Sequence, residues 1–126
     1  MILSFEKFFE NKTMGIHKVK LTNPLNGDAV EVVAKFDTGA RFSSIDKEVA
    51  RELGFDEDTI NGDKKSDEVS GTATTKSANG EEERIFVDMN ICHTGNEVVK
   101  TQVSITDRSH MEFPVLIGLK DMDQVK

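Results

Sequence analysis

An apolar segment over residues 29 to 36 runs directly into the sequence Asp37-Thr38-Gly39-Ala40. The segment is rich in valine and alternates loosely between apolar and polar side chains, which predicts a β-strand. A carboxylate at the end of such a strand is held rigidly and partly removed from water. Gly39 lets another backbone segment approach closely, and Thr38 offers a hydroxyl for a buried hydrogen bond. The motif therefore favours a fixed, reactive carboxylate at Asp37, although the tripeptide alone fits an ordinary Asx-type turn equally well.

Other short segments with strand patterns lie on both sides of this motif. Strands are predicted over residues 16–22, 29–36, 84–92, 97–106 and 115–117, with turns at 24–28, 79–80 and 94–96. The Asn79-Gly80 pair is typical of a tight hairpin because both residues tolerate positive φ. Short strands with turns at these intervals predict a mainly β fold, either a small barrel or a sandwich.

One helix is expected soon after the aspartate motif. Ser43 and Asp46 fit a capping box, in which the serine hydroxyl satisfies a free backbone N–H at the start of the helix. Ile45, Val49 and Leu53 would then form the apolar face of this helix. A second helical turn is expected near the C-terminus, over residues 119–123.

Three segments are expected to contribute little to the core. Residues 56–68 are acidic with few apolar side chains, which predicts a solvated loop, and residues 69–79 are mostly Ser, Thr, Gly and Ala. Near the N-terminus, Phe5, Phe8 and Phe9 have helical spacing, so residues 1–15 are either a short helix or a poorly ordered lead-in. The folded domain is therefore expected to span residues 16–126.

Length and charge exclude several classes of function. The chain of 126 residues fits one domain, and its formal net charge of −7 argues against a nucleic acid partner, which needs a basic face. No apolar run approaches the ~18 residues of a membrane helix, and the first residues do not form a signal peptide. A single cysteine, Cys92, cannot form an internal disulfide. We expect a cytoplasmic protein that does not contact membranes.

The candidate metal ligands are His17, Cys92, His93 and His110. They do not form a His-Glu-x-x-His motif or a Cys-x-x-Cys pair, and neighbours such as Cys92 and His93 point to opposite faces of a strand. Neither a metal site nor another cofactor is expected. A role for Cys92 as a nucleophile is not expected either, because nothing in the sequence marks a partner base.

From residue 16 to about residue 122, the sequence resembles the retropepsin-like aspartic proteases. Four parts carry the resemblance, in this order: Asp37-Thr38-Gly39-Ala40 after an apolar strand, Ser43-Ser44-Ile45-Asp46 with the helix that follows, a polar hairpin in the place of the flap, and Phe113-Pro114-Val115-Leu116-Ile117-Gly118. Residues 37–41 and 107–109 look most similar to the prokaryotic branch often labelled "ATP-dependent zinc protease", whose members can accompany ATP-grasp ligases.

The resemblance implies a small closed β-barrel of the retropepsin type, with one or two short helices, that acts as a homodimer. Each subunit would supply one Asp37, and the two carboxylates would share a proton. The ionised carboxylate takes a proton from the attacking water, and the protonated one polarises the peptide carbonyl. Thr38 would brace the pair across the twofold axis beside Gly39. An extended peptide would pair as an added strand between the flaps and the dimer floor.

The resemblance also implies which residues touch the substrate: Ala40, Arg41, Gly71, Thr72 and Ala73. Because Ala40 cannot donate a hydrogen bond to the ionised carboxylate as a serine would, we expect a working pH nearer neutral than in serine-bearing relatives.

Two arginines and one leucine leave questions open at this stage. Arg41 and Arg108 either pair with an acidic group and hold the aspartate loop, or they are ordinary surface charges. Leu119 stands where many retropepsins have arginine, which leaves open which group secures the dimer-facing loops.

Three functions fit these observations. The first is a homodimeric aspartic endopeptidase, which the intact Asp-Thr-Gly favours. The second is a non-catalytic, peptide-binding or regulatory module, because the polar flap region over residues 70–80 offers little apolar grip on a substrate. The third, which follows from family association alone, is an amidase acting on amino-acid tails that an associated ATP-grasp ligase adds.

Overall fold

The computed structural model describes residues 15–77, 80–93 and 97–125. Residues 1–14 of the lead-in expected over 1–15, the turn residue Asn79 and the turn at 94–96 lie outside the described residues. The elements, in chain order, are β1 (Gly15–Thr22), β2 (Ala29–Phe36), β3 (Ser44–Asp46), α2 (Lys47–Glu52), α3 (Glu57–Ile60), β4 (Val69–Ser77), β5 (Gly80–His93), β6 (Val99–Thr106), β7 (Val115–Ile117) and α4 (Leu119–Val125).

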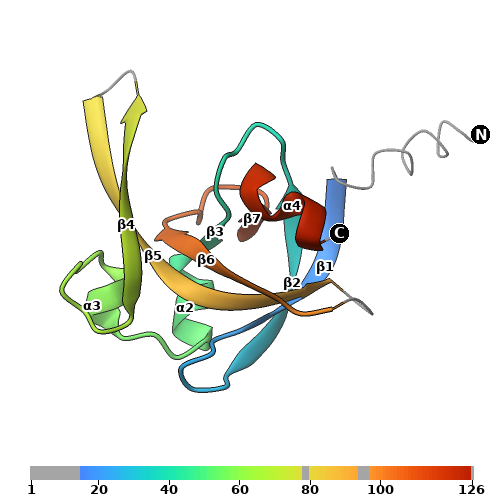
Figure 1. Cartoon of the computed structure of the whole chain (residues 1–126), viewed down its shortest axis with the longest axis horizontal. Coiled ribbons are helices and arrows are strands. Elements are labelled where there is room, and N and C mark those ends of the chain that lie inside the picture. Colours follow the sequence, from blue (N-terminus) through green and yellow to red (C-terminus); the bar gives the residue numbers. More distant parts are fainter. Residues whose placement is uncertain (1–14, 78–79, 94–96, 126) are drawn as a thin grey trace, which may run out of the picture.

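Six of the strands close into a small barrel (Figure 1). Their order is β1-β2-β7-β3-β6-β5, and pairing of β1 with β5, from Val19 opposite His93 to Thr22 opposite Asn90, closes the ring. The first half of the long β5 pairs instead with β4, and this hairpin projects away from the barrel (Figure 1). The predicted mainly β fold with a small closed barrel and short helices is confirmed.

Strand β7 lies between β2 and β3 in the barrel. It runs parallel to β2, with Ile117 opposite Phe36, and antiparallel to β3, with Val115 opposite Ile45. Because β2 and β7 are parallel and end in register, the residues that follow them emerge at the same end of the barrel. These residues are Asp37 and Gly118.

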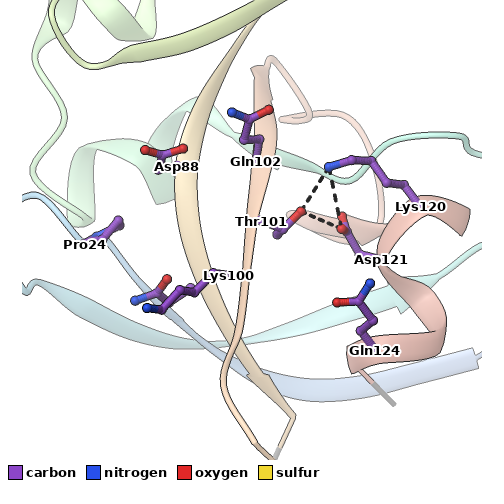
Figure 2. Close-up of a pocket in the computed structure, with 9 residues that line it drawn as sticks. Pro24, Asp88, Lys100, Thr101, Gln102, Lys120, Asp121 and Gln124 are labelled. Atoms are coloured by element: carbon purple, nitrogen blue, oxygen red, sulfur yellow. Dashed lines mark hydrogen bonds and ion pairs between the residues drawn. The ribbon is translucent and has the colours of Figure 1, made fainter.

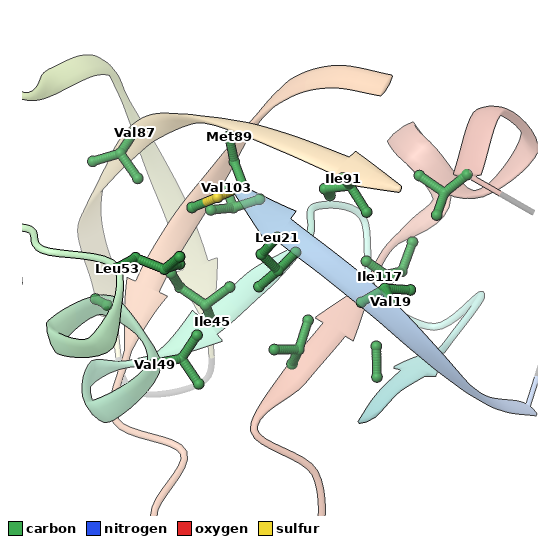
Figure 3. Packing of buried hydrophobic residues seen from close by; sticks show 14 of the residues in the cluster. Val19, Leu21, Ile45, Val49, Leu53, Val87, Met89, Ile91, Val103 and Ile117 are labelled. Atoms are coloured by element: carbon green, nitrogen blue, oxygen red, sulfur yellow. The ribbon is translucent and has the colours of Figure 1, made fainter. Parts of the chain in front are cut away.

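The core follows from the alternation of side chains along the strands. In β1, the buried Val19 and Leu21 alternate with the exposed Lys18 and Lys20, so one face of the strand points into the barrel. Side chains from the other strands and from helix α2 meet them there (Figure 3). Each large apolar side chain that is fully removed from water contributes about 1.5–3 kcal/mol, so this cluster can stabilise the domain without a disulfide or metal.

Helix α2 begins later than the sequence predicts. Residues 44–46 form β3, and the helix starts at Lys47 with Asp46 as its N-cap, whose carboxylate accepts a hydrogen bond from the Glu48 N–H. The predicted capping box at Ser43 is therefore wrong. The local signal is overridden by tertiary structure, because β3 fills the position between β7 and β6.

The acidic segment over residues 56–68 contains the short helix α3 and is not only a solvated loop. Thr59 and Ile60 are buried, and Ile60 belongs to the core cluster. The Thr59 hydroxyl is hydrogen-bonded to Ser66 Oγ at 2.6 Å and to the Glu68 carboxylate. One apolar residue among many acidic ones was too weak a pattern to predict this anchor. Among the described helices, none has the length and apolar character needed to cross a membrane.

Candidate active site

Asp37 directly follows β2, and hydrogen bonds fix both its backbone and its side chain. Its N–H donates to the Ile117 carbonyl at 3.0 Å, and its carbonyl accepts from the Ala40 N–H at 3.1 Å. The Gly39 N–H donates to Asp37 Oδ1 at 2.8 Å, which is an Asx-type turn. The sequence left an Asx-type turn and a fixed carboxylate as alternatives. The structure contains both, because the hydrogen bond of the turn is the one that orients the carboxylate. The Asp37 side chain is still 31% exposed, so solvent and other molecules can reach it.

Two basic side chains act on Asp37. Lys35 Nζ lies 4.0 Å from Asp37 Oδ2, but both side chains are partly exposed, so this pair contributes little. Arg108 is more buried: burial lowers the pKa of its guanidinium, while the charges of Asp46 and Asp37 raise it. The Arg108 Nε donates to the Phe113 carbonyl at 2.9 Å. Arg108 is thus a fixed positive charge within electrostatic reach of Asp37, and not an ordinary surface charge.

The turn after β7 lies against the loop that carries Asp37. The Leu119 N–H donates to the Ala40 carbonyl at 2.8 Å, and the Lys120 N–H donates to the Arg41 carbonyl at 3.1 Å. Together with the bond from Asp37 to Ile117, these contacts hold the two segments together along their length. The second sequence signature therefore has a structural role, because it forms the support for the aspartate loop.

Gly118 packs closely against the aspartate loop. A Cβ at this position would lie 2.6 Å from the Phe42 carbonyl oxygen and 2.9 Å from the Ala40 carbonyl oxygen, both of them backbone atoms. The Gly118 N–H donates to Ser43 Oγ at 3.0 Å. Only glycine lets the β7–α4 turn reach this position without moving the aspartate loop.

A groove of about 600 Å³ lies between the aspartate loop and the β4–β5 hairpin. It is lined by Ala40, Arg41, Phe42, Ser44, Ala73, Thr74, Arg84, Arg108 and Leu116. Three of these residues are arginines, so the groove is basic although the whole chain carries a net charge of −7. Such a groove attracts negatively charged groups.

The predicted site residues are distributed unevenly around this groove. Ala40, Arg41 and Ala73 line it, whereas Gly71 and Thr72, earlier in β4, do not. The catalytic candidates Asp37, Thr38 and Gly39 lie beside the groove in the adjoining loop, where Thr38 and Gly39 are exposed. In this exposed position Thr38 and Gly39 are accessible to other molecules.

Sequence reasoning did not identify Arg84 of the groove or the buried Asp121, and it assigned Ser43 only to a helix cap. Arg84 could have been found from the register of the hairpin, because it pairs with the predicted site residue Ala73. The Arg41 guanidinium, which was an open question, lies 5.6 Å from the centre of the Phe42 ring. A second depression, of about 650 Å³, lies between β5, β6 and α4 and contains none of the predicted site residues (Figure 2).

Two of the candidate metal ligands, His17 and His93, pack together beside Phe36. The two imidazole centroids are 4.9 Å apart, and His17 lies equally close to the Phe36 ring. His17 Nε2 and His93 Nδ1 are buried and have no hydrogen-bond partner among the described residues. Within residues 15–77, 80–93 and 97–125, no three His, Cys, Asp or Glu side chains are grouped so as to hold a metal ion.

Comparison with known proteins identifies similarities at the levels of family and fold. Residues 16–126 match the model of the RimB-like family, described as "Retropepsin-like aspartic endopeptidase RimB". None of the curated proteins matches the chain. The solution structure of the simian foamy virus (mac) protease is similar, with a TM-score of 0.55 and 13% identity over 86% of this chain and 91% of that one.

A second solved structure is similar at a lower level. It is the crystal structure of Lpg0085 from Legionella pneumophila subsp. pneumophila str. Philadelphia 1, a DUF785 protein of unknown function. Its TM-score is 0.43, with 18% identity over 84% of this chain and 82% of that one. The viral protease supports the barrel fold alone, and the Legionella protein is too distant in structure to support an argument.

Gly118→Ala tests the close contact between the two segments. The added methyl group meets the Phe42 backbone, so we expect a loss of roughly 1–3 kcal/mol in the free energy of unfolding, measured by urea denaturation. The control is Gly71→Ala, where the nearest atom to the new Cβ is Gln102 Oε1 at 3.8 Å. It should change the unfolding free energy by less than about 0.5 kcal/mol. Equal stability of the two variants would contradict the contact.

The half-buried imidazole of His93 predicts a loss of stability in mild acid. Burial lowers the pKa of His93, the charge of His17 lowers it further, and a hydrogen bond to the Val125 backbone partly opposes both. The unfolded chain therefore binds a proton more readily than the folded one. The free energy of unfolding should have its full value above about pH 6.5. At lower pH it should decrease, by at most ~1.4 kcal/mol per pH unit for this group.

Urea denaturation between pH 8 and pH 5 measures this decline. The exposed His110 gives a matched control, since His110→Gln should leave the decline unchanged, while His93→Leu should reduce it. Carboxyl groups whose pKa is lowered, such as Asp107, change the free energy of unfolding only at more acidic pH, so they do not affect this measurement. Constant stability of the unmodified protein from pH 7.5 to pH 5.5 would contradict the prediction.

Proposed function

The chain belongs to the RimB-like family of retropepsin-like aspartic endopeptidases, and on this basis we propose that it is a homodimeric aspartic peptidase. It hydrolyses peptide bonds with one Asp37 from each subunit and an activated water. The observation that carries this proposal is the position of Asp37. Its carboxylate is oriented by the Gly39 N–H, and its loop is supported by the turn at Gly118.

The dimer follows from the chemistry of the reaction. Peptide hydrolysis by this route needs one ionised and one protonated carboxylate about 3 Å apart, which share a proton because both cannot ionise easily. The sequence contains one Asp-Thr-Gly, so a single chain supplies half of the pair. The exposed Thr38 and Gly39 lie where a second copy can approach, and Thr38 braces the pair across the axis.

In the proposed mechanism, the two Asp37 carboxylates titrate as a unit. The ionised carboxylate removes a proton from water as the water attacks the peptide carbonyl carbon. The protonated carboxylate donates a hydrogen bond to the carbonyl oxygen and stabilises the tetrahedral oxyanion. Ala40 offers no side-chain donor to the ionised carboxylate, which supports a working pH nearer neutral than in serine-bearing relatives.

The basic groove supports an extended peptide with acidic side chains as the substrate. Arg41, Arg84 and Arg108 lie on different segments around it, so successive carboxylates of a peptide could each meet a guanidinium. The hairpin contributes the outermost strand, β4, whose outer edge is open among the described strands. A peptide can add to such an edge through its own backbone.

A non-catalytic, peptide-binding module is the second candidate. It is favoured by one observation: Ala40 and Arg41 line the groove of the single chain, whereas Asp37 does not. Placement in the branch labelled "ATP-dependent zinc protease", and with it any pairing with an ATP-grasp ligase or action on ligated amino-acid tails, is a finer prediction that rests on the sequence resemblance.

Asp37→Asn tests the aspartic mechanism. Cleavage of a peptide library should fall by roughly 10³-fold or more, because an amide cannot act as the base. The exposed Asp67→Asn is a matched control that should retain full activity. Equal activity of Asp37→Asn and the unmodified protein would exclude this mechanism, and binding without any cleavage by the unmodified protein would favour the second candidate.

The same variant tests whether the site is shared between subunits. Equal amounts of Asp37→Asn and of the unmodified protein are mixed so that they exchange subunits, and about one dimer in four then carries two Asp37 residues. The activity should be about one quarter of that of the same total amount of unmodified protein. A site contained in one chain would retain about one half. The mass in solution, measured in parallel, shows whether the dimer is present.

Arg84→Gln tests the substrate class. Losing a charged hydrogen-bond donor from the groove should lower kcat/KM for acidic peptides by roughly ten-fold or more and affect neutral peptides much less. Arg51→Gln is a matched control, because Arg51 lies on α2 and pairs with Glu48 and Glu57 away from the groove. An equal loss for acidic and neutral peptides would contradict a preference for acidic substrates.

A further inference from the structure

Asp121, in the first turn of helix α4, is a buried carboxylate that the proposed reaction does not use. Its side chain is 4% exposed. Asp121 Oδ2 accepts a hydrogen bond from Ser43 Oγ at 2.7 Å, and Oδ1 accepts one from Thr101 Oγ1 at 2.5 Å. Figure 2 shows Thr101 and Lys120 beside it, with Lys120 Nζ 3.9 Å from Oδ1. Both carboxylate oxygens therefore have defined partners from distant parts of the chain.

The carboxylate determines the orientation of the Ser43 hydroxyl. A carboxylate accepts hydrogen bonds and donates none, so the Ser43 hydrogen must point toward Asp121. The lone pairs of Ser43 Oγ are then turned toward the Gly118 N–H, which donates to them at 3.0 Å. Asp121, Ser43 and Gly118 are all buried, so water would not easily replace a hydrogen-bond partner that one of them loses.

Gly118 also packs against the aspartate loop with no room for a side chain. The residues after it, Leu119 and Lys120, donate their N–H groups to the carbonyls of Ala40 and Arg41. A displacement of the turn at Gly118 is therefore transmitted to the loop in which the Gly39 N–H orients the Asp37 carboxylate. Hydrogen bonds from Asp121 to Ser43 to Gly118 thus connect helix α4 with the candidate catalytic group.

We propose that Asp121 is a positioning residue, which acts through Ser43 to fix the turn at Gly118 and, with it, the Asp37 carboxylate. The proposal rests on the proposed function where it concerns activity. Its structural part, the connection from Asp121 to Gly118, can be tested whether or not the protein is a peptidase.

The first test does not depend on activity. In Ser43→Ala the Gly118 N–H loses its acceptor, so amide hydrogen exchange at Gly118 should accelerate at least ten-fold. Asp121→Ala, which releases the Ser43 hydroxyl, should also accelerate it. Thr59→Val is the matched control: it removes another buried hydroxyl, bonded to Ser66 and Glu68 outside this chain of bonds, and should leave exchange at Gly118 unchanged. Unchanged exchange in Ser43→Ala would overturn the proposal.

The second test is a double-mutant cycle on peptide cleavage. We expect Ser43→Ala and Asp121→Ala each to lower kcat by roughly 10–100-fold with little change in KM, and the double variant to be no slower than either single one. Asp121→Asn should retain most of kcat, because its amide oxygen can face Ser43 while its NH₂ group faces Thr101. Thr59→Val should keep the original kcat even where its melting temperature falls.

The outcomes separate the two proposals. If the losses in the double variant multiply, or if kcat follows melting temperature in all variants including Thr59→Val, Asp121 has no positioning role. If Asp121→Ala does not fold, Ser43→Ala and Asp121→Asn decide the question between them. If Asp37→Asn is as active as the unmodified protein, the proposed function fails, and hydrogen exchange at Gly118 alone decides on the connection from Asp121.

Discussion

The parallel pairing of β2 with β7 is the constraint on which the rest of the site depends. Phe36 and Ile117 end the two strands in register, so the chain leaves the barrel twice at the same point, once into Asp37 and once into Gly118. The two exits then bond to each other through backbone groups, and the lack of a side chain at Gly118 lets them touch. The register of the two strands in the barrel therefore determines where the carboxylate lies.

The parts of the molecule that could be predicted from sequence are those with short-range patterns. The valine-rich strand before Asp37 and the apolar run ending at Ile117 were both clear from composition, and a closed mainly β barrel followed from the resemblance that they carry. The pattern did not reveal the barrel's closing contact between β1 and β5, since that pairing joins residues far apart in the sequence. The resemblance implied that the barrel is closed, but not which strands meet to close it.

Ser43 shows why the remainder was not predictable. Its neighbours fit a helix cap, which is a local pattern, and the structure assigns that cap to Asp46. The partners of Ser43 are instead Asp121 and Gly118, which are 78 and 75 residues away in the sequence. A hydroxyl makes equally good hydrogen bonds to a nearby backbone N–H or to a distant carboxylate, so only the tertiary fold decides between them. For the same reason Arg84 became a candidate for the groove only once the hairpin register was known.

The proposed carboxylate pair, shared between two subunits, would place an unusual demand on each of them. Two groups that exchange one proton must lie about 3 Å apart, and a loop free to move by an ångström would lose that geometry. In the proposed dimer, a contact made through the exposed Thr38 and Gly39 would not supply such rigidity by itself, because these residues themselves need to be positioned. In the proposed dimer, each chain would therefore have to hold its own Asp37 before the second subunit binds. The bonds from Ile117, Leu119 and Lys120 to the aspartate loop, supported through Ser43 by a carboxylate in the last helix, are arranged to do this.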